Sequence, residues 1–477
     1  MDKYDLILVG SGFAATFFLL KYLGKNRNAR VLMLERGRND THQWRIDHRE
    51  QMDPSGVVSS ENYNDTYINE TPEKPWVYTP SLGGGSNCWW ACTPRFMPND
   101  FKIYSKYGVG TDWPISYDDL EPYYCEAESI MNISGSHEST PFPMSRPYPQ
   151  PPHKFNEVDK LLKKKYPNMF YHMPTARPSR NTNNRLACCA SGVCNLCPID
   201  SKFTILNELS HLFNDKRVRV ELGSQVLSVI IENNLAKGVT YIKDSIEHEV
   251  YGDMVALGAN SLFNAHILAS SGQIHPLLGK FLSEQVAFSC RVNLDGVNNF
   301  TGSTSLTGHG YMLYDGDHRR NHAACLIETF NIPKIRLEKG KYTQVAHYKF
   351  IFDDVPMLAN QVNLSNDSRK PKVIYNGHSS YVDRAIQNAK NNIYSLFDCL
   401  PVESIEYSAG VHRTEAHILG TALMGDDPKG SVVNKFQALH NVSNLLSLGG
   451  SSFASISPAN PTLTIAALSL WSADHIN

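Results

Sequence analysis

The stretch that decides the fold lies near the start of the chain and reads Tyr4-Asp5-Leu6-Ile7-Leu8-Val9-Gly10-Ser11-Gly12-Phe13-Ala14-Ala15. Its apolar run at 6–9 predicts a fully buried strand, and 14–23 predicts the helix that returns over that strand. Gly10 and Gly12 permit the tight turn that brings helix N–H groups to a pyrophosphate, and the small residue Ala15 permits close packing of helix on strand.

A second apolar run, Val31-Leu32-Met33-Leu34, ends in Glu35. We expect a strand here, parallel to the first, with Glu35 at its end accepting hydrogen bonds from both hydroxyls of an adenosine ribose. Strand, glycines, helix, strand and acid occur in the order that a dinucleotide-binding domain requires. A glycine turn with a purely structural role is the alternative interpretation.

Length and charge limit the classes of function. The 477 residues suffice for two domains with a sizeable core, and a formal charge of −2 gives no electrostatic reason to expect nucleic acid or an anionic membrane as a partner. No apolar run is long enough to span a bilayer, and the first strand starts too close to Met1 to leave room for a signal peptide. We therefore expect a cytoplasmic protein, with export beside a signal-bearing partner left open. Most of its ten cysteines are then expected to be free or ligating.

A second glycine-rich stretch follows a polar excursion at 40–75 and reads Pro80-Ser81-Leu82-Gly83-Gly84-Gly85-Ser86-Asn87-Cys88-Trp89-Trp90. Three consecutive glycines let the backbone pass very close to a flat, charged ligand, and the aromatic residues can pack behind them. An ordinary glycine loop is the alternative interpretation.

Together these motifs resemble the glucose–methanol–choline (GMC) oxidoreductases, the FAD-dependent family that oxidises alcohols. The stretch 110–124, which begins Gly-Thr-Asp-Trp-Pro, is similar to the bacterial sugar and polyol dehydrogenase branch of that family. The resemblance implies an α/β fold with a Rossmann-like FAD-binding domain of the GMC/p-hydroxybenzoate hydroxylase-like type, and a second α+β substrate domain built on an antiparallel sheet. It implies that 1–40, 76–105, 200–275 and 405–477 form the first domain, and that 106–199 and 276–404 form the second.

The resemblance also implies which residues hold FAD. Glu35 would bind the adenosine ribose, the glycine loop would run along the isoalloxazine, and the backbone of Val226 would pair with the adenine. Some relatives attach the flavin covalently through a histidine in this loop, so Cys88 is interpreted as a thioether link or as a packed thiol. The residues expected to contact the cofactor are Gly10, Gly12, Phe13, Ala14, Glu35, Arg36, Gly84, Gly85, Ser86, Asn87, Cys88, Val226, Ala256, Gly258, Gly450, Ser451, Pro461 and Thr462.

A cysteine-rich loop at 188–198 reads Cys-Cys-Ala-Ser-Gly-Val-Cys-Asn-Leu-Cys-Pro and resembles an iron–sulphur binding loop. In the sugar-dehydrogenase branch a similar loop binds a three-iron cluster that carries electrons outward from the flavin. This would make Cys189, Cys194 and Cys197 ligands and an electron-accepting protein a partner. The gap from Cys194 to Cys197 is one residue shorter than in that branch, so zinc and packed thiols remain alternatives.

The region 280–400 alternates polar and apolar residues, chiefly at 287–292 and 342–352, which predicts an antiparallel sheet flooring a substrate pocket. Four histidines in this region are expected to be surface or packing residues: His309, His318, His322 and His347. The spacing of His318 and His322 would suit a metal on a helix, but Gly316 and Asp317 beside them indicate a turn.

The last seventy residues resemble the family segments that carry the chemistry. His417 opens the stretch 417–425, and Asn460 stands in 459–467, directly before an expected helix. A histidine can take the alcohol proton as hydride leaves for flavin N5, an asparagine can orient the hydroxyl, and a helix N-terminus would stabilise negative charge on the reduced ring. His412 is an alternative base, and Gly449 replaces the acid that usually contacts the cofactor in the family.

We therefore expect an FAD-dependent oxidoreductase that oxidises a CH–OH group of a sugar, polyol or other alcohol, with His417 as the base and Asn460 beside it. Two alternatives share the fold. One is an alcohol oxidase that uses oxygen, and the other is a flavoprotein with lyase-like chemistry or a binding function.

Overall fold

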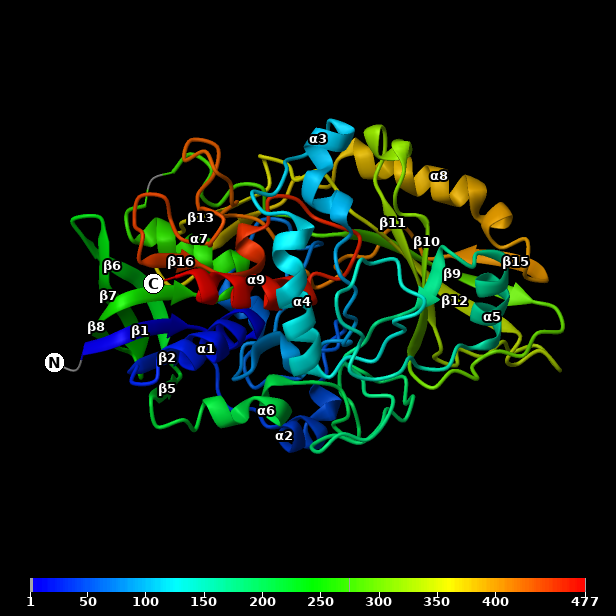
Figure 1. Ribbon diagram of the computed structural model, residues 1–477, viewed down its shortest axis with the longest axis horizontal. Coiled ribbons are helices and arrows are strands. Elements are labelled where there is room, and N and C mark those ends of the chain that lie inside the picture. The colour runs from blue at the N-terminus through cyan, green and yellow to red at the C-terminus, as the bar shows by residue number, and fades with distance from the viewer. Residues whose placement is uncertain (1–2, 274, 477) are drawn as a thin grey trace.

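A computed structural model describes residues 3–273 and 275–476 and shows two sheets at opposite ends of the molecule, with helices between and over them (Figure 1). The first is a seven-stranded sheet. Six of its strands lie in the order β5-β2-β1-β8-β7-β6, and the seventh, β16, pairs with β8. Its strands are β1 (Lys3–Val9), β2 (Val31–Glu35), β5 (Val218–Leu222), β6 (Gln225–Glu232), β7 (Leu235–Lys243), β8 (Ile246–Leu257) and β16 (Leu445–Ser447).

The parallel part of this sheet forms because its strands are apolar on both faces. All five residues of β2 are buried, as are the last four of β1 and the last three of β8. The neighbours β1, β2, β5, β8 and β16 run parallel, so their carboxyl ends meet at one edge. Three helices pack near this sheet: α1 (Phe13–Lys25), α7 (Asn260–Ser270) and α9 (Thr462–His475).

The second sheet is antiparallel, in the order β15-β9-β12-β11-β10-β4. Its strands are β4 (Phe170–His172), β9 (Val286–Leu294), β10 (Leu306–Leu313), β11 (Cys325–Phe330), β12 (Val345–Phe352) and β15 (Val402–Tyr407). Helix α8 (Ser380–Leu396) buries an apolar stripe against one face, where Phe288, Phe350 and Ile393 share a core. The other face carries polar residues that lie opposite one another in register: Ser289, Lys349, Glu328 and His309.

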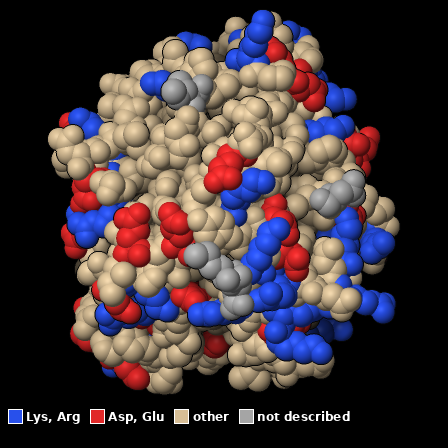
Figure 2. Space-filling view, turned by 90° about the vertical axis from the view of Figure 1, so that its left-hand side faces the viewer, with Lys and Arg blue, Asp and Glu red and all other residues tan. Residues whose placement is uncertain are grey.

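The remaining elements are short or connect the two sheets. Strands β3 (Ile68–Asn69), β13 (Gln361–Asn363) and β14 (Lys372–Ile374) form a small third sheet. Helix α4 (Tyr117–Met131) packs on α9, and the other helices are α2 (His42–Asp47), α3 (Ile103–Tyr107), α5 (Glu157–Lys165) and α6 (Ile205–Glu208). No helix among the described residues is long and apolar enough to cross a membrane. Figure 2 shows acidic and basic side chains interspersed on one end of the molecule, in keeping with the formal charge of −2.

The structure confirms the α/β fold with a doubly wound sheet, and the antiparallel sheet lies where the alternation predicts it. The strand expected at 31–34 extends through Glu35, and the one expected at 342–352 begins later, at Val345. His318 lies in a 3₁₀ turn at Asp317–Arg320, as Gly316 and Asp317 indicated. His309 is fully buried and His347 is partly buried, so both pack within the protein.

The turn after β1 generates a prediction about stability. Gly10 has a φ of +88°, and a Cβ there would lie 2.7 Å from the carbonyl oxygen of Gly258. Gly10→Ala should therefore destabilise the protein by more than the roughly 1–3 kcal/mol that a strained backbone conformation alone costs. The matched control is Gly108→Ala, because Gly108 has a φ of +76° with nothing within 4 Å of its Cβ position. The melting temperature of the apoprotein is the measurement, and equal losses in the two variants would contradict the prediction.

Candidate active site

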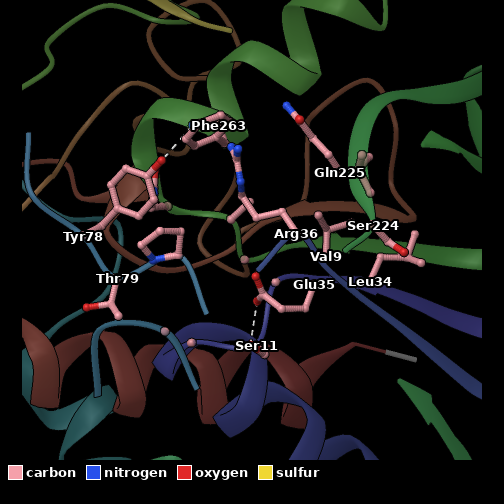
Figure 3. A pocket seen from close by; sticks show the side chains of 18 of the residues that line it. Val9, Ser11, Leu34, Glu35, Arg36, Tyr78, Thr79, Ser224, Gln225 and Phe263 are labelled. Carbon is pink, nitrogen blue, oxygen red and sulfur yellow. Dashed lines mark hydrogen bonds between the residues drawn. The ribbon is translucent and has the colours of Figure 1, made fainter. Parts of the chain in front are cut away.

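A cleft opens where β1 and β2 end, at the carboxyl edge of the parallel strands (Figure 3). Its volume is about 690 Å³, which includes the part open to solvent. The turn after β1, the end of β2, the glycine loop, the start of β6 and the start of α7 all contribute to its walls. Among the lining residues are Gly10, Gly12, Glu35, Arg36, Tyr78, Gly84, Gly85, Val226, Gly258 and Phe263.

Glycines make this cleft by letting backbones touch. A Cβ on Gly84 would lie 2.9 Å from the Cα of Gly12, so the glycine loop sits directly on the turn after β1. The Cβ positions of Gly12 and Gly85 meet no atom within 4 Å, and both residues line the cleft. A side chain at either position would therefore enter the empty space. The cradle is of the kind that admits a pyrophosphate close to a backbone.

Glu35 is held rigidly at the floor of the cleft. Its carboxylate accepts hydrogen bonds from Ser11 Oγ at 2.6 Å and from the Gly37 N–H at 2.8 Å (Figure 3). Ser11 Oγ in turn accepts from the Gly83 N–H at 3.0 Å. Burial raises the pKa of Glu35, while these hydrogen bonds and Arg36 oppose the rise. Each carboxylate oxygen keeps a further lone pair, so Glu35 can still accept from ribose hydroxyls.

Arg36 borders the same space beside Phe263. One guanidinium nitrogen, Nη2, donates to Glu61 at 2.6 Å, and the guanidinium carbon lies 5.0 Å from the centre of the Phe263 ring. Nε and Nη1 are buried and have no hydrogen-bond partner within the described part of the chain. Buried donors without acceptors are costly, which favours a ligand that supplies acceptors here. Together with the glycine cradle and Glu35, this donor set fits an adenine dinucleotide such as FAD.

The other expected cofactor residues lie around the cleft or beyond it. Phe13 packs against Trp89 with ring centres 4.7 Å apart, and Asn87 Nδ2 donates to the carbonyls of Leu82 and Gly84, which braces the glycine loop. Cys88 is half-buried with a free thiol. Ten of the expected residues do not line the described cleft: Phe13, Ala14, Ser86, Asn87, Cys88, Ala256, Gly450, Ser451, Pro461 and Thr462. Conversely, Tyr78 and Phe263 line the cleft without being expected from the sequence, where their only signal was a position near a glycine-rich turn.

The structure also gives a reason for Gly449. This residue has a φ of +78°, and a Cβ would lie 2.9 Å from the Cβ of Ala14 at the start of α1. A glycine therefore suits the close packing of the chain before α9 against α1. An acidic side chain would have to begin in that contact.

His417 lies between the antiparallel sheet and the chain that leads into α9. Its Nδ1 lies 2.5 Å from Gln285 Oε1, at the edge of β9, and its backbone N–H donates to Glu284 Oε1 at 2.9 Å. Burial lowers the pKa of His417 to about 4; Glu415 opposes the fall and Lys349 adds to it. The imidazole is therefore neutral at physiological pH and can accept a proton.

Asn460 stands two residues before α9, with its side chain only 8% exposed. Its Oδ1 has no hydrogen-bond partner among the described residues. Gln285 links the two candidate groups, because its Nε2 donates to the carbonyl of Ala459, next to Asn460, while its Oε1 contacts His417. Gln285 thus ties His417 to the backbone of the residue directly before Asn460.

The alternative base, His412, has both ring nitrogens engaged. Nδ1 lies 2.9 Å from Glu415 and Nε2 lies 3.0 Å from Ser289 Oγ. Glu415 also pairs with Lys349. Burial alone would raise the pKa of Glu415, but Lys349 and His412 lower it to about 2. His412 therefore belongs to a buried ionic network, whereas His417 Nε2 has no partner in the described chain.

The cysteine-rich loop surrounds a second, small pocket, whose volume of about 240 Å³ includes the part open to solvent. Cys188 and Cys189 line it together with Cys194, Cys197 and two buried cations, Arg177 and Lys202. All four cysteines are free, Cys189 is exposed, and the described residues contain no preformed group of three metal-ligating side chains. Burial lowers the pKa of Lys202 to about 8, and nearby cysteines oppose this. Cys188 is not among the three ligands expected from the sequence, yet it lines the same pocket.

Known proteins resemble this chain over nearly its whole length. The sequence model described as GMC oxidoreductase matches residues 381–469. Fructose dehydrogenase large subunit of Gluconobacter japonicus is 25% identical over 99% of this chain and 97% of its own. The 2-methyl-1,2-propanediol dehydrogenase of Mycolicibacterium austroafricanum is also 25% identical, over 100% and 95% of the two chains. Pyridoxine 4-oxidase from Mesorbium loti has the same fold, with a TM-score of 0.68, 14% identity and coverage of 99% of each chain.

The cleft generates a prediction about cofactor binding. Gly12→Val should fold, because nothing lies within 4 Å of the new Cβ, but its side chain would occupy the space that the pyrophosphate needs. We expect the purified variant to lack flavin, while the parent protein carries one FAD per chain. Flavin absorbance per protein and the melting temperature with added FAD measure this. Gly24→Val, at an open and exposed position on α1, is the control and should keep its flavin. Full FAD binding by Gly12→Val would refute the assignment.

Proposed function

From the premise that this chain belongs to the GMC oxidoreductase family, we propose that it oxidises a CH–OH group of a sugar, polyol or other alcohol, with FAD as its cofactor. One observation carries the chemical part of the proposal. Within the described part of the chain, the neutral imidazole of His417 has one nitrogen occupied by Gln285 and the other without a partner, and the same glutamine contacts the residue next to Asn460. Relatives named for fructose and for a propanediol support the substrate class.

FAD would be held by the first sheet and by the glycine loop. In this proposal the turn at Gly10 and Gly12 receives the pyrophosphate, Glu35 the ribose, and Val226 the adenine. The stretch from Gly84 to Cys88 and the start of α9 would face the flavin ring. In the same proposal the first sheet belongs to an FAD-binding domain, and the antiparallel sheet belongs to a substrate-binding domain. When bound, FAD would supply the acceptor for the hydride of the alcohol, which carries both electrons of the oxidation.

The chain's own residues manage the proton. We propose that the substrate hydroxyl donates to His417 Nε2, which takes the proton as the carbonyl product forms. The amide of Asn460 would hold the same oxygen and stabilise its developing negative charge, which suits its unpartnered Oδ1 and its amide donor. A pKa of about 4 keeps His417 ready as an acceptor over the neutral range. The rate should therefore fall as the pH drops through that value, because the protonated ring can no longer accept.

The cysteine cavity favours a dehydrogenase over an oxidase. We propose that it holds an iron–sulphur cluster on Cys194, Cys197 and Cys189, with Cys188 as a further candidate ligand. The supporting observation is charge: Arg177 and Lys202 are buried beside the thiols, where they would balance the negative charge of a thiolate-ligated cluster. The thiols would have to turn inward to ligate, since the described residues offer no preformed trio. Electrons would then leave singly, to an electron-accepting protein.

The first test removes the base. His417→Ala should keep its FAD but reduce it more slowly by a factor of roughly 10² to 10⁴, the usual contribution of a general base. Its residual rate should climb with pH, because hydroxide or a more ionised alcohol can partly replace the imidazole. Stopped-flow flavin bleaching under anaerobic conditions, with a panel of sugars and alcohols, is the measurement. His248→Ala, on the exposed end of β8, is the control. A wild-type rate in His417→Ala, with a slow His412→Ala, would move the base to His412.

Asn460→Ala should have a smaller effect than His417→Ala. It removes one hydrogen bond of roughly 1–3 kcal/mol and leaves the proton acceptor in place. The same bleaching experiment measures the difference, and a loss larger than that of His417→Ala would contradict the assigned roles.

A separate test concerns iron. Protein purified without oxygen should be brown, contain at least as much iron as flavin and show an iron–sulphur magnetic resonance signal. Cys194→Ser combined with Cys197→Ser should lose the iron and keep the FAD. Cys399→Ser, at a half-buried thiol elsewhere, should keep both. Iron-free parent protein from this preparation would show that the cysteines are packed thiols.

A further inference from the structure

Gln285 occupies an unusual place for a neutral side chain. It is only 4% exposed and directly precedes β9. Its Nε2 donates to the carbonyl oxygens of Ser457, at 2.6 Å, and of Ala459, at 2.8 Å. Its Oε1 lies 2.5 Å from His417 Nδ1. The one amide therefore joins the antiparallel sheet, the candidate base and the chain that carries Asn460.

The chemistry of these partners fixes which amide atom is which. Nitrogen and oxygen of a glutamine amide are otherwise easily exchanged. Here two backbone carbonyls face one end of the amide, and a carbonyl can only accept, so that end must be the NH₂ group. The other end is then the oxygen, which can only accept as well. His417 Nδ1 must therefore carry a proton, and in the neutral ring the lone pair is left on Nε2.

The surroundings of the amide keep it from turning. Ser457 Oγ donates to Asp100 Oδ2 at 2.9 Å, and Asp100 pairs with the buried Arg319 at 2.9 Å. On the other side, Glu284 Oε1 accepts the backbone N–H groups of Glu415, at 2.8 Å, and of His417, at 2.9 Å. Gln285 thus lies between two segments, those of Ser457 and His417, that are each held by further hydrogen bonds.

We infer that Gln285 is a positioning residue, which holds His417 in the Nδ1–H tautomer with the lone pair of Nε2 available and ties the ring to the segment of Asn460. This inference rests on the proposed role of His417 as proton acceptor. It assigns to Gln285 no contact with the substrate.

Several charged groups also act on His417 and must stay constant in any test. They are Glu415 on its own segment, Lys349 from β12, Glu328 from β11, and Lys74, which pairs with Glu284. His412 adds to this set through Glu415. Substitutions at Gln285 alter none of them. A change in the titration of His417 would therefore report on the amide.

The first measurement does not depend on activity. In flavin-loaded protein labelled with ¹⁵N-histidine, at neutral pH, the resonances of His417 are identified by their loss in His417→Gln. We expect Nδ1 to appear protonated and Nε2 to appear as an imine-type nitrogen. A protonated Nε2, or an even mixture of tautomers, would overturn the inference, whatever the enzyme does with alcohols.

The second measurement uses two variants and a control. Gln285→Met keeps the bulk but removes the acceptor, so the limiting rate of flavin reduction should fall by about 10- to 100-fold, the usual effect of a supporting hydrogen bond. The substrate concentration for half-maximal rate should change little. Gln387→Met, on the exposed face of α8, should match the parent. A parent-like rate in Gln285→Met would count against the inference.

Gln285→Glu tests the pH dependence of the rate, which should not change if Gln285 had only a structural role. A carboxylate at this place stabilises the imidazolium, so the pH at which the rate is halved should rise by about 1 unit or more. An unchanged midpoint would overturn the inference. The two proposals fail differently, because a parent-like rate in His417→Ala refutes the base itself, while the tautomer is read directly from the resonances. If a Gln285 variant does not fold, the spectrum of the parent still decides.

Discussion

The contact among the backbones at Gly10, Gly84 and Gly258 is the constraint on which the rest of the structure depends. A Cβ on Gly10 or on Gly84 would enter a neighbouring backbone, and one on Gly258 would meet Ala15. Because these three residues have no Cβ atom, the glycine loop can lie directly on the turn after β1. It also brings the Gly83 N–H to Ser11, whose hydroxyl donates to Glu35. Three segments far apart in the chain thereby define one cradle, and the cleft follows from their closeness.

A second constraint sits at the junction of the two sheets. The face of the antiparallel sheet that turns away from α8 carries Lys349 and Glu328, and the ion pair of Lys349 with Glu415 fixes the strand beside His417. Buried charges of this kind are tolerated only when paired. Here the positive charge of Lys349 and the negative charge of Glu415 offset each other close to His417, the candidate base. Gln285 completes the junction with neutral hydrogen bonds, so the ring is oriented by groups that leave its proton affinity low.

The two parts of the molecule thus serve different needs of the proposed reaction. In that proposal the parallel sheet would present backbone N–H groups and a buried acid to a dinucleotide, which requires close approach of the backbone. The junction would present a lone pair and an amide to an alcohol, which requires that both groups be oriented. The cysteine cavity lies beyond the glycine loop, and Lys202 joins the two by donating to the carbonyls of Asn87 and Trp89.

The sequence by itself determined the first strand, the glycine turn, Glu35 and the alternating strands of the second sheet, because each is written in a local period or spacing. It also singled out His417 and Asn460, through a motif. Only the tertiary structure decided the role of Gln285, which lies 132 residues from His417 in the chain. A glutamine before a strand carries no local signal in the sequence. Its proposed role depends on the two backbone carbonyls that accept from its amide in the folded protein. The low pKa of His417 and the place of Cys188 beside two buried cations were likewise decided by packing, since burial and distant charges act only once the chain has folded.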